Sequence, residues 1–504
     1  MKNVFHQVAF MLLLTLFAGC RTPGFRERTE DAMKFRRSLC EETVAYFATN
    51  SGPLTLSGSM ELARSRTLKL TQVQLDEQLA KIQRTTAFAA FLPEVEVAFS
   101  RSATDVPIER SLGDMTIQLN DQYVNTTSIT LTQPIFTPNT WLLFTEAKKA
   151  LRARDLIRSR AEELLDVQVA SLFYQTAVSE EMLKTYMKQR DATRTLSEQI
   201  DALAQHGYAL SAEKARAKAR LSSDNYQLRK ANDTLTLARA RLFEILCFWP
   251  LQQIKVDGES MKTVLSRDWI LTDAKGDALR MSRDQVKSLS PEELLWQTLV
   301  NRKELWAGDQ MIEIRKTEVL RALSDFLPTL YGSTSGNYTT ESLQLPTQYW
   351  AGGLTAVLSV FNGFQTINSY REAKARRQAE YQTQEDRALA LLVAAFEAWQ
   401  NWQRTFEQRD VTAQVLEAAE SDYQVSQARY HEDLTTLSEV LDKLALLESA
   451  RVGAVSAEYA CALAEIVLRD AMGVGLNETR TMEKDAAEAF RKKGLLNGTL
   501  KRQE

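Results

Sequence analysis

The chain has 504 residues, a formal net charge of −3, and only 19 glycines and 10 prolines. This length exceeds what one compact core usually holds, so it predicts two or more domains or an elongated fold. The near balance of charge argues against a general nucleic-acid surface. Glycine and proline occur at about half their usual frequency, which favours long helices.

The N-terminus has the pattern of a secretory signal. Lys2 gives a basic start, and residues 8–17, VAFMLLLTLF, form an apolar run too short to remain as a membrane-spanning helix. The following FAGC resembles a bacterial lipobox, which implies removal of residues 1–19 and lipidation of Cys20. An ordinary secretory signal cut nearby is the alternative. Arg21 follows this cysteine. In bacterial lipoproteins an aspartate at that position favours retention in the inner membrane, so the resemblance implies the outer membrane instead.

The mature sequence contains an internal duplication. Two stretches that begin Phe-Leu-Pro, FLPEVEVAFS at Phe91 and FLPTLYGSTS at Phe326, lie in different halves of the chain. QPIF and LSVF follow them in the same order. Two further pairs share one common offset: EAKKA with EAKAR, and HGYALSAE with EDLTTLSE. Each half predicts helix, strand, strand, long helix, turn and long helix, and a period this long indicates a duplicated domain rather than a solenoid.

The predicted strands alternate apolar and polar residues. After Pro93, the side chains of Val95, Val97 and Phe99 fall on one face, and NTTSITLTQPIF and GGLTAVLSVF alternate in the same way. The third segment, TLYGSTSGNYTT, is polar and contains glycine, so its pattern is weaker.

The predicted helices are unusually long. No proline or glycine interrupts residues 139–205, which at ~1.5 Å per residue would reach about 100 Å. The second half repeats this plan from Gly363 to about Arg429, again without an internal proline or glycine. Helically spaced aromatic residues of this second helix, Phe396, Trp399, Trp402 and Phe406, indicate core packing. The return helices carry apolar or small residues at heptad spacing, which predicts close helix pairing: Leu221, Leu228, Leu235 and Leu242 in the first, and Ala457, Cys461, Ala464, Leu468 and Ala471 in the second.

Six segments follow from these patterns. We expect a signal peptide at 1–19, a lipidated and extended lead-in at 20–55, a first repeat at 56–248, an inter-repeat insertion at 249–289, a second repeat at 290–473 and a C-terminal tail at 474–504. The fold class is mainly α with a small β part.

The strand number constrains how such a chain meets a membrane. Four strands cannot close a membrane barrel, because the smallest such barrels have about eight, and open edges leave backbone groups unpaired in lipid. If the strands enter a membrane, several chains must share one barrel. Helices of about 100 Å must then project from a bilayer of about 30 Å.

These features resemble TolC-like outer-membrane efflux proteins, in the lipoprotein branch. The resemblance covers roughly residues 55–475 and rests on the paired FLP starts, QPIF, LSVFNGF, and RYHEDLTTLSEVLDKLALLE at Arg429–Glu448, where Asp433 stands at the usual glycine. It implies a homotrimer with a twelve-stranded barrel in outer-membrane lipid and a trimeric α-barrel in the periplasm. The implied partners are a periplasmic adaptor protein and an inner-membrane pump, either proton-driven or of the ABC type.

The resemblance also implies functional positions at the turns of the helical hairpins. The first tip contains Gly207, Tyr208, Ala209 and Leu210, and the second contains Asp433, Leu434, Thr435 and Thr436; these residues would contact the adaptor and form the gate. An acidic ring of Asp201, Glu432 and Asp433 would set ion selectivity. The alternatives are ordinary turn residues and solvated helix ends.

Other classes of protein compete with the channel. The sequence shows no Cys/His metal spacing, phosphate-binding glycine loop or Gly-x-Ser-x-Gly motif, so we expect no enzyme, cofactor or metal site. A duct for type I protein secretion has the same fold. A non-channel periplasmic coiled-coil lipoprotein would explain the helices but not the four amphipathic strands.

Overall fold

The computed structural model describes residues 24–476, except 51, 107–108, 114, 119–120, 253, 261–265, 274–276, 342–343 and 433. The described residues form two compact units, and each unit takes segments from both repeats. Unit 1 holds residues 24–67, 168–266 and 407–463, and unit 2 holds 68–167, 267–406 and 464–476. Cys20 and nearly all of the predicted tail lie outside the described residues.

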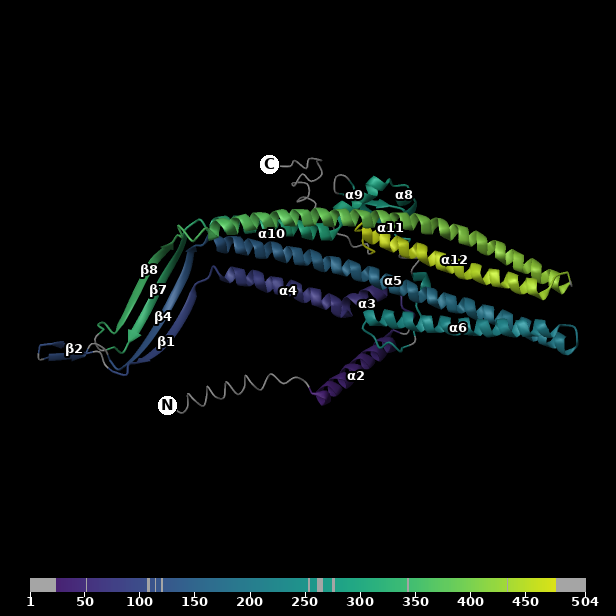
Figure 1. Cartoon of the computed structure of the whole chain (residues 1–504), viewed down its shortest axis with the longest axis horizontal. Helices are drawn as coiled ribbons and strands as arrows, with labels where there is room; N and C mark the ends of the chain where they lie inside the picture. Colours follow the sequence, from purple (N-terminus) through teal and green to yellow (C-terminus); the bar gives the residue numbers. More distant parts are fainter. Residues whose placement is uncertain are drawn as a thin grey trace. The chain divides into compact units, whose positions relative to one another are not determined.

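The predicted order of elements is confirmed in both halves (Figure 1). The first half contains α4 (Leu68–Ala89), β1 (Glu94–Ala103), β4 (Tyr123–Phe136), α5 (Pro138–Gln205) and α6 (Ser211–Ile245). The second contains α10 (Lys303–Ser324), β7 (Thr329–Thr339), β8 (Gln348–Val357), α11 (Gln365–His431) and α12 (Leu437–Ala471). The helices α6 and α12 have 35 residues each, and a single offset in the numbering relates both their first and their last residues. No helix within the described ranges has an apolar stretch that would let it cross a membrane.

The two Phe-Leu-Pro stretches form the same helix-to-strand turn. In the first, the backbone N–H groups of Phe91 and Leu92 donate to carbonyls three residues earlier, at 3.0 and 2.9 Å. The N–H groups of Phe326 and Leu327 do the same at 3.2 and 2.9 Å. The proline that follows has no N–H to continue the helix, and the strand begins at the next residue.

The lead-in is not extended, so that prediction is wrong. Its described part forms helix α2 (Phe25–Thr49), which is followed by α3 (Leu56–Arg66). The segment has no glycine or proline within α2, and the Glu27 carboxylate caps the helix by accepting from the Gly24 N–H at 3.1 Å. Near its other end the buried Thr43 hydroxyl accepts a hydrogen bond from the Trp249 N–H at 2.9 Å. The sequence does favour this helix, since residues 25–49 contain no glycine or proline. Pro23 and Gly24 directly before it are typical of irregular segments, which led to the wrong prediction.

The heptad seam of α6 is partly confirmed. Leu235 and Leu242 are buried, while Leu221 and Leu228 are only half-buried. Asp224 is also buried on this helix; it accepts a hydrogen bond from Gln189 of α5 at 2.9 Å. A buried carboxylate in an apolar seam requires such partners, so it fixes which residues of α5 and α6 face each other.

The segment between the repeats packs onto the second repeat within unit 2. It contains the hairpin β5 (Trp269–Thr272) and β6 (Ala278–Met281) and helix α8 (Arg283–Lys287), and α9 (Pro291–Asn301) follows. The Trp269 ring lies 6.2 Å from the ring of Trp402, and both side chains are almost fully buried. The aromatic residues Trp399 and Trp402 therefore belong to a core cluster, as predicted, whereas Phe396 is 42% exposed.

A cluster of buried charges joins α5, α10 and α12 in unit 2. The Arg160 guanidinium, 6% exposed, donates to both carboxylate oxygens of Asp470 at 2.6 and 3.0 Å and to Glu304 at 2.6 Å. Arg302 donates to the Asp470 carbonyl at 2.6 Å. Each charge has a partner, which offsets the cost of burial. These contacts hold the end of α12 at the start of α10.

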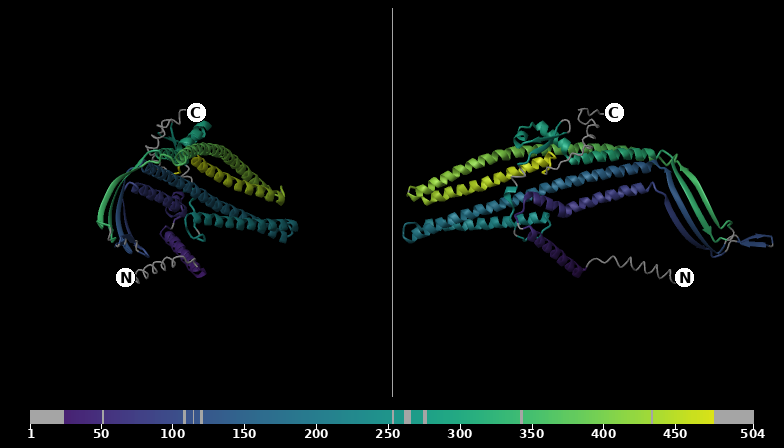
Figure 2. Two further views of the ribbon diagram at one scale, coloured as in Figure 1. Left: turned by 60° about the vertical axis from the view of Figure 1, so that its left-hand side comes forward. Right: turned by 180° about the vertical axis from the view of Figure 1, so that it is seen from behind.

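Four strands form one antiparallel sheet in the order β1-β4-β7-β8 (Figures 1 and 2). The strands of the two repeats meet at β4 and β7, with a bulge between Pro134 and Phe136. A second hairpin, β2 (Glu109–Leu112) with β3 (Met115–Gln118), lies in the chain between β1 and β4 and has no counterpart between β7 and β8 among the described residues.

Candidate functional site

The four-stranded sheet has one apolar face. Paired residues of an antiparallel sheet point to the same side, so the register defines rows across it. One such row runs from Val97 through Ile129 and Gly336 to Trp350. Large apolar side chains of this face are exposed in the single chain, among them Phe99 at 69% and Trp350 at 69%.

The opposite face of the sheet is polar. The next row runs from Glu96 through Thr130 and Ser335 to Ala351. Neighbouring rows add further hydroxyl and amide groups, including Ser128 paired with Asn337. A sheet with one apolar and one polar face suits a boundary between lipid and water.

Glycines on the third strand explain why its sequence looks polar. A Cβ atom placed on Gly336 would lie 2.9 Å from ring atoms of Trp350, and one on Gly332 would lie 3.2 Å from Cδ1 of Ile135. Side chains of the neighbouring strands therefore cover the glycine positions of β7. The apolar face continues across β7 although β7 itself supplies few apolar side chains.

Both outer strands of the sheet keep an open edge. β1 pairs only with β4, and β8 pairs only with β7, among the described residues. Each outer strand has 10 residues, and every side chain along it is exposed. Long open edges of this kind invite pairing with a strand of another chain.

The first helical hairpin turns at residues 206–210. Gly207 adopts a left-handed backbone with φ of +80°, which glycine accepts most readily. The Tyr208 N–H then donates to the Leu203 carbonyl at 2.9 Å and closes the end of α5. Tyr208 and Leu210 are exposed at 82% and 69%.

The second hairpin tip repeats this closing hydrogen bond. The Leu434 N–H donates to the Arg429 carbonyl at 2.8 Å, and the offset that relates α6 to α12 also relates these two residues to Tyr208 and Leu203. Leu434 is 62% exposed, and the Thr435 hydroxyl donates to Glu439 of α12. Thr436 directly precedes α12. Asp433 lies outside the described residues.

The two tips meet just behind their turns within unit 1. Ile200 of α5, Ala217 of α6 and Leu437 of α12 form a small buried cluster, and Ala209 and Tyr430 pack against it. The tip residues predicted from the sequence thus divide in two. Ala209 packs against this buried cluster, whereas Tyr208, Leu210 and Leu434 are exposed.

The acidic residues near the tips differ in their surroundings. Asp201 lies 2.5 Å from the ammonium of Lys214 on the returning helix, and this hydrogen bond lowers the pKa of the Asp201 carboxyl. Glu432 is exposed in the second turn. The acidic ring stays a prediction. In such a ring the negative charge of Asp201 would be largely compensated by Lys214.

The sequence model of the outer membrane efflux protein family matches residues 59–247 and 294–474. The chain belongs to this family. The family consists of efflux channels rather than enzymes. No curated protein sequence matches the chain significantly.

Solved structures of outer-membrane channels share the fold. VceC of Vibrio cholerae aligns with a TM-score of 0.67 at 17% identity, covering 84% of this chain and 97% of VceC. The Campylobacter jejuni CmeC channel aligns at 0.67 and 14% identity, with 87% and 88% covered. The open state of the Neisseria gonorrhoeae MtrE channel aligns at 0.66 and 17% identity, with 85% and 91% covered.

Replacement of Gly336 by alanine tests the covered glycine. We expect G336A to lower the free energy of unfolding by about 1 kcal/mol per chain, because the new methyl group displaces the Trp350 ring. G353A is the matched control, since Gly353 faces open space on the polar side. Urea titrations in phospholipid vesicles measure both. In a W350A background G336A should be neutral, and an equal cost in both backgrounds would contradict the packing.

Replacement of Gly207 tests the first tip. We expect G207A to destabilise the turn by about 1–2 kcal/mol, since alanine is strained at positive φ. Asparagine tolerates this conformation better, so G207N should cost less. Amide hydrogen exchange of residues 206–213 measures the effect. Exchange that is equally slow in G207A and the unaltered protein would exclude a requirement for the left-handed turn.

Proposed function

We propose that the chain is the outer-membrane channel of a tripartite efflux system. Three copies form one channel, which gives substrates a passive exit from the cell. An inner-membrane pump supplies the energy, and a periplasmic adaptor connects the pump to the channel. Membership of the outer membrane efflux protein family and the shared fold support this proposal.

The two-faced sheet with open edges carries the proposal. In a lipid bilayer each unpaired backbone N–H or C=O costs several kcal/mol, so β1 and β8 need partners there. Pairing of β1 with β8 of the next copy closes the ring without any new strand. Three copies supply twelve strands, a number within the range of known membrane barrels.

The register assigns each face of the sheet to a surrounding. The face with Val97, Ile129 and Trp350 contacts lipid, and the face with Glu96 and Thr130 lines the water-filled pore. The opposite assignment would put Glu96 in hydrocarbon, where carboxylates are unfavourable.

The long helices continue the passage beyond the membrane. α5 begins two residues after β4 ends, and α11 begins eight residues after β8 ends. Both helices then run for more than 65 residues without interruption, too long to lie within a bilayer. A tube of such helices from three copies crosses the periplasm.

The hairpin tips are the proposed contact with the adaptor and the proposed gate. Tyr208, Leu210 and Leu434 present apolar surface that no residue of the described chain covers fully. Exposed aromatic and aliphatic residues at a fixed turn suit a protein contact. Asp433, Thr435 and Thr436 complete the proposed surface of the second tip.

A lipid on Cys20 would add a second membrane anchor in the outer membrane of a Gram-negative-type bacterium. The lipobox-like FAGC supports this part of the proposal. The barrel inserts by its own apolar face, so the lipid is not required for membrane insertion.

Neighbouring substitutions in β1 test the two faces. Glu96→Lys reverses three pore charges per channel, so we expect the preference for cations to fall while folding is retained. Val97→Lys puts an ammonium group against lipid at a cost of about 2 kcal/mol per copy, so we expect a loss of folded protein. Planar-bilayer reversal potentials and heat-modifiable trimers in membrane fractions are the measurements.

The opposite pattern would exclude the proposed orientation of the sheet. It would appear as loss of trimers for E96K with normal trimers for V97K. Release of the unaltered protein from membranes by mild salt, as a monomer without conductance, would exclude the channel itself.

Substitution of Cys20 tests the lipid anchor. We expect C20S to abolish incorporation of radiolabelled palmitate, because the serine hydroxyl cannot replace the thiol as lipid acceptor. C40S is the matched control and should label normally. Undiminished labelling of C20S would rule out this attachment site.

A further inference from the structure

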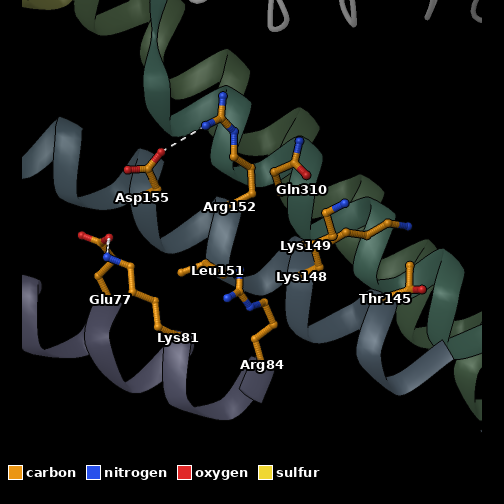
Figure 3. A pocket seen from close by; sticks show the side chains of 10 residues that line it. All are labelled: Glu77, Lys81, Arg84, Thr145, Lys148, Lys149, Leu151, Arg152, Asp155 and Gln310. Carbon is orange, nitrogen blue, oxygen red and sulfur yellow. Dashed lines mark hydrogen bonds and ion pairs between the residues drawn. The ribbon is translucent and has the colours of Figure 1, made fainter. Parts of the chain in front are cut away.

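A groove between α4 and α5 in unit 2 has no role in the proposed channel. We call it the α4–α5 groove and define it by Lys81, Arg84 and Phe88 of α4 and Phe144, Lys148 and Arg152 of α5. Figure 3 shows the larger of its two cavities, with Lys81, Arg84, Lys148 and Arg152. It contains a cavity of about 610 Å³ and a neighbouring one of about 450 Å³. Arg84 and Lys148 line both cavities.

The acidic residues at one end of the groove are already neutralised. Glu77 lies 2.6 Å from Lys81 and 2.7 Å from Arg158. Asp155 lies 3.1 Å from Arg152 and 3.2 Å from Arg158. Each carboxylate thus has two cationic partners, which leaves neither carboxylate to compensate Arg84 or Lys148.

Two cations of the groove have no carboxylate of their own. Arg84 and Lys148 are exposed, and within the described part of the chain neither forms an ion pair. Lys149 differs, since its ammonium turns to α10, where it lies 3.6 Å from Glu313. Figure 3 shows the Arg84 side chain extending from α4 toward α5. The pair therefore provides a site for an anionic group.

An aromatic cluster adjoins these cations on the side of the strands. The ring of Phe144 lies 5.9 Å from that of Phe88 and 6.1 Å from that of Phe91, and Phe91 lies 5.0 Å from Trp141. Phe88 is 50% exposed and Trp141 is 63% exposed. Such half-exposed rings are typical of the interface between membrane and water.

The positions of the two groups along the helices match the layers of a membrane surface. Arg84 lies five residues before the end of α4, and Lys148 lies ten residues after the start of α5. These separations correspond to about 8 and 15 Å from the ends that lead to the strands. The side chain of Lys148 tilts toward the start of α5, which brings its ammonium closer to the sheet.

We propose that the α4–α5 groove binds an anionic phospholipid of the leaflet that faces the periplasm. Arg84 and Lys148 hold the phosphate of the headgroup, and Phe88 and Trp141 contact the glycerol and the upper acyl chains. The charge of the groove selects the anionic headgroup, and the adjoining rings favour a lipid over a free ion. This inference rests on the proposed function, because it requires the sheet to lie in the membrane.

Native mass spectrometry of the full assembled protein tests the groove. Detergent-solubilised protein is titrated with phosphatidylglycerol, and phosphatidylcholine serves as the uncharged comparison. We expect R84Q/K148Q to weaken phosphatidylglycerol binding by about 10- to 30-fold, as two lost lysine or arginine contacts to an anionic lipid imply. The matched control K69Q/R154Q removes exposed cations of the same two helices outside the groove and should bind within twofold of the unaltered protein.

Conductance in planar bilayers, measured on the same preparations, separates this inference from the proposed channel. Conducting channels whose phosphatidylglycerol affinity is unchanged in R84Q/K148Q would overturn the lipid site and leave the channel standing. Displacement of phosphatidylglycerol by equimolar inorganic phosphate would also overturn it, because the groove would then bind the phosphate group without any preference for a lipid. If the double variant does not assemble, R84Q and K148Q singly carry the test, with about a fivefold loss expected for each. Equal binding by both single variants and the unaltered protein would then overturn the site.

Discussion

The proposed channel depends on one constraint, the need to pair every backbone N–H and C=O group that enters lipid. Among the described residues, the inner strands β4 and β7 are paired on both sides, whereas β1 and β8 are each paired on one side only. In the proposed channel a single copy is therefore incomplete, although each of its strands is well formed. In the proposed channel, pairing between copies would complete the barrel, and the same step would fix how the helices of neighbouring copies meet. In this account, assembly of the copies and insertion into the membrane both depend on the pairing of β1 with β8 of the next copy.

Gene duplication provides an economical route to this arrangement, and the two halves show which features were kept. The Phe-Leu-Pro turns use equivalent hydrogen bonds, and the hairpin tips do so as well. The offset between the halves is larger at the turns, from Phe91 to Phe326, than at the tips, from Tyr208 to Leu434, so the intervening strand region has changed length. The extra hairpin β2–β3 and the longer β4 lengthen the first repeat, and the longer connection between β8 and α11 offsets part of this difference in the second. The long helices that follow the strands have nearly the same length, 68 residues in α5 and 67 in α11.

The strand face shows a different kind of divergence. In β1 the apolar face is supplied by its own valine and phenylalanine side chains. In β7 glycines occupy that face and Trp350 and Ile135 cover them. The apolar face thus continues across the sheet, although the side chains that cover it at β7 come from neighbouring strands. The sequence of a single strand does not predict this covering of glycines, because the covering residues lie on other strands.

Much of the fold was predictable because the signals were local and repeated. Period-two alternation after Pro93, the uninterrupted helix from residue 139 and the heptads of α6 each depend on residues close in sequence. The lead-in helix α2 was missed because its only strong start signal, the Glu27 cap, follows a proline and a glycine. The charge cluster around Arg160 and the α4–α5 groove were missed for another reason. Their members come from helices that lie far apart in sequence, and only packing brings Arg160 to Asp470 or Arg84 to Lys148.

The central claim is that successive side chains of β1 face lipid and water in turn. Single cysteines at each of residues 94–100, in a background without Cys40, Cys247 and Cys461, test it through labelling by a membrane-impermeant thiol reagent in reconstituted vesicles. The account predicts labelling at Glu94, Glu96, Ala98 and Ser100 and protection at Val95, Val97 and Phe99. Uniform labelling along the strand, or protection at the even positions, would contradict it.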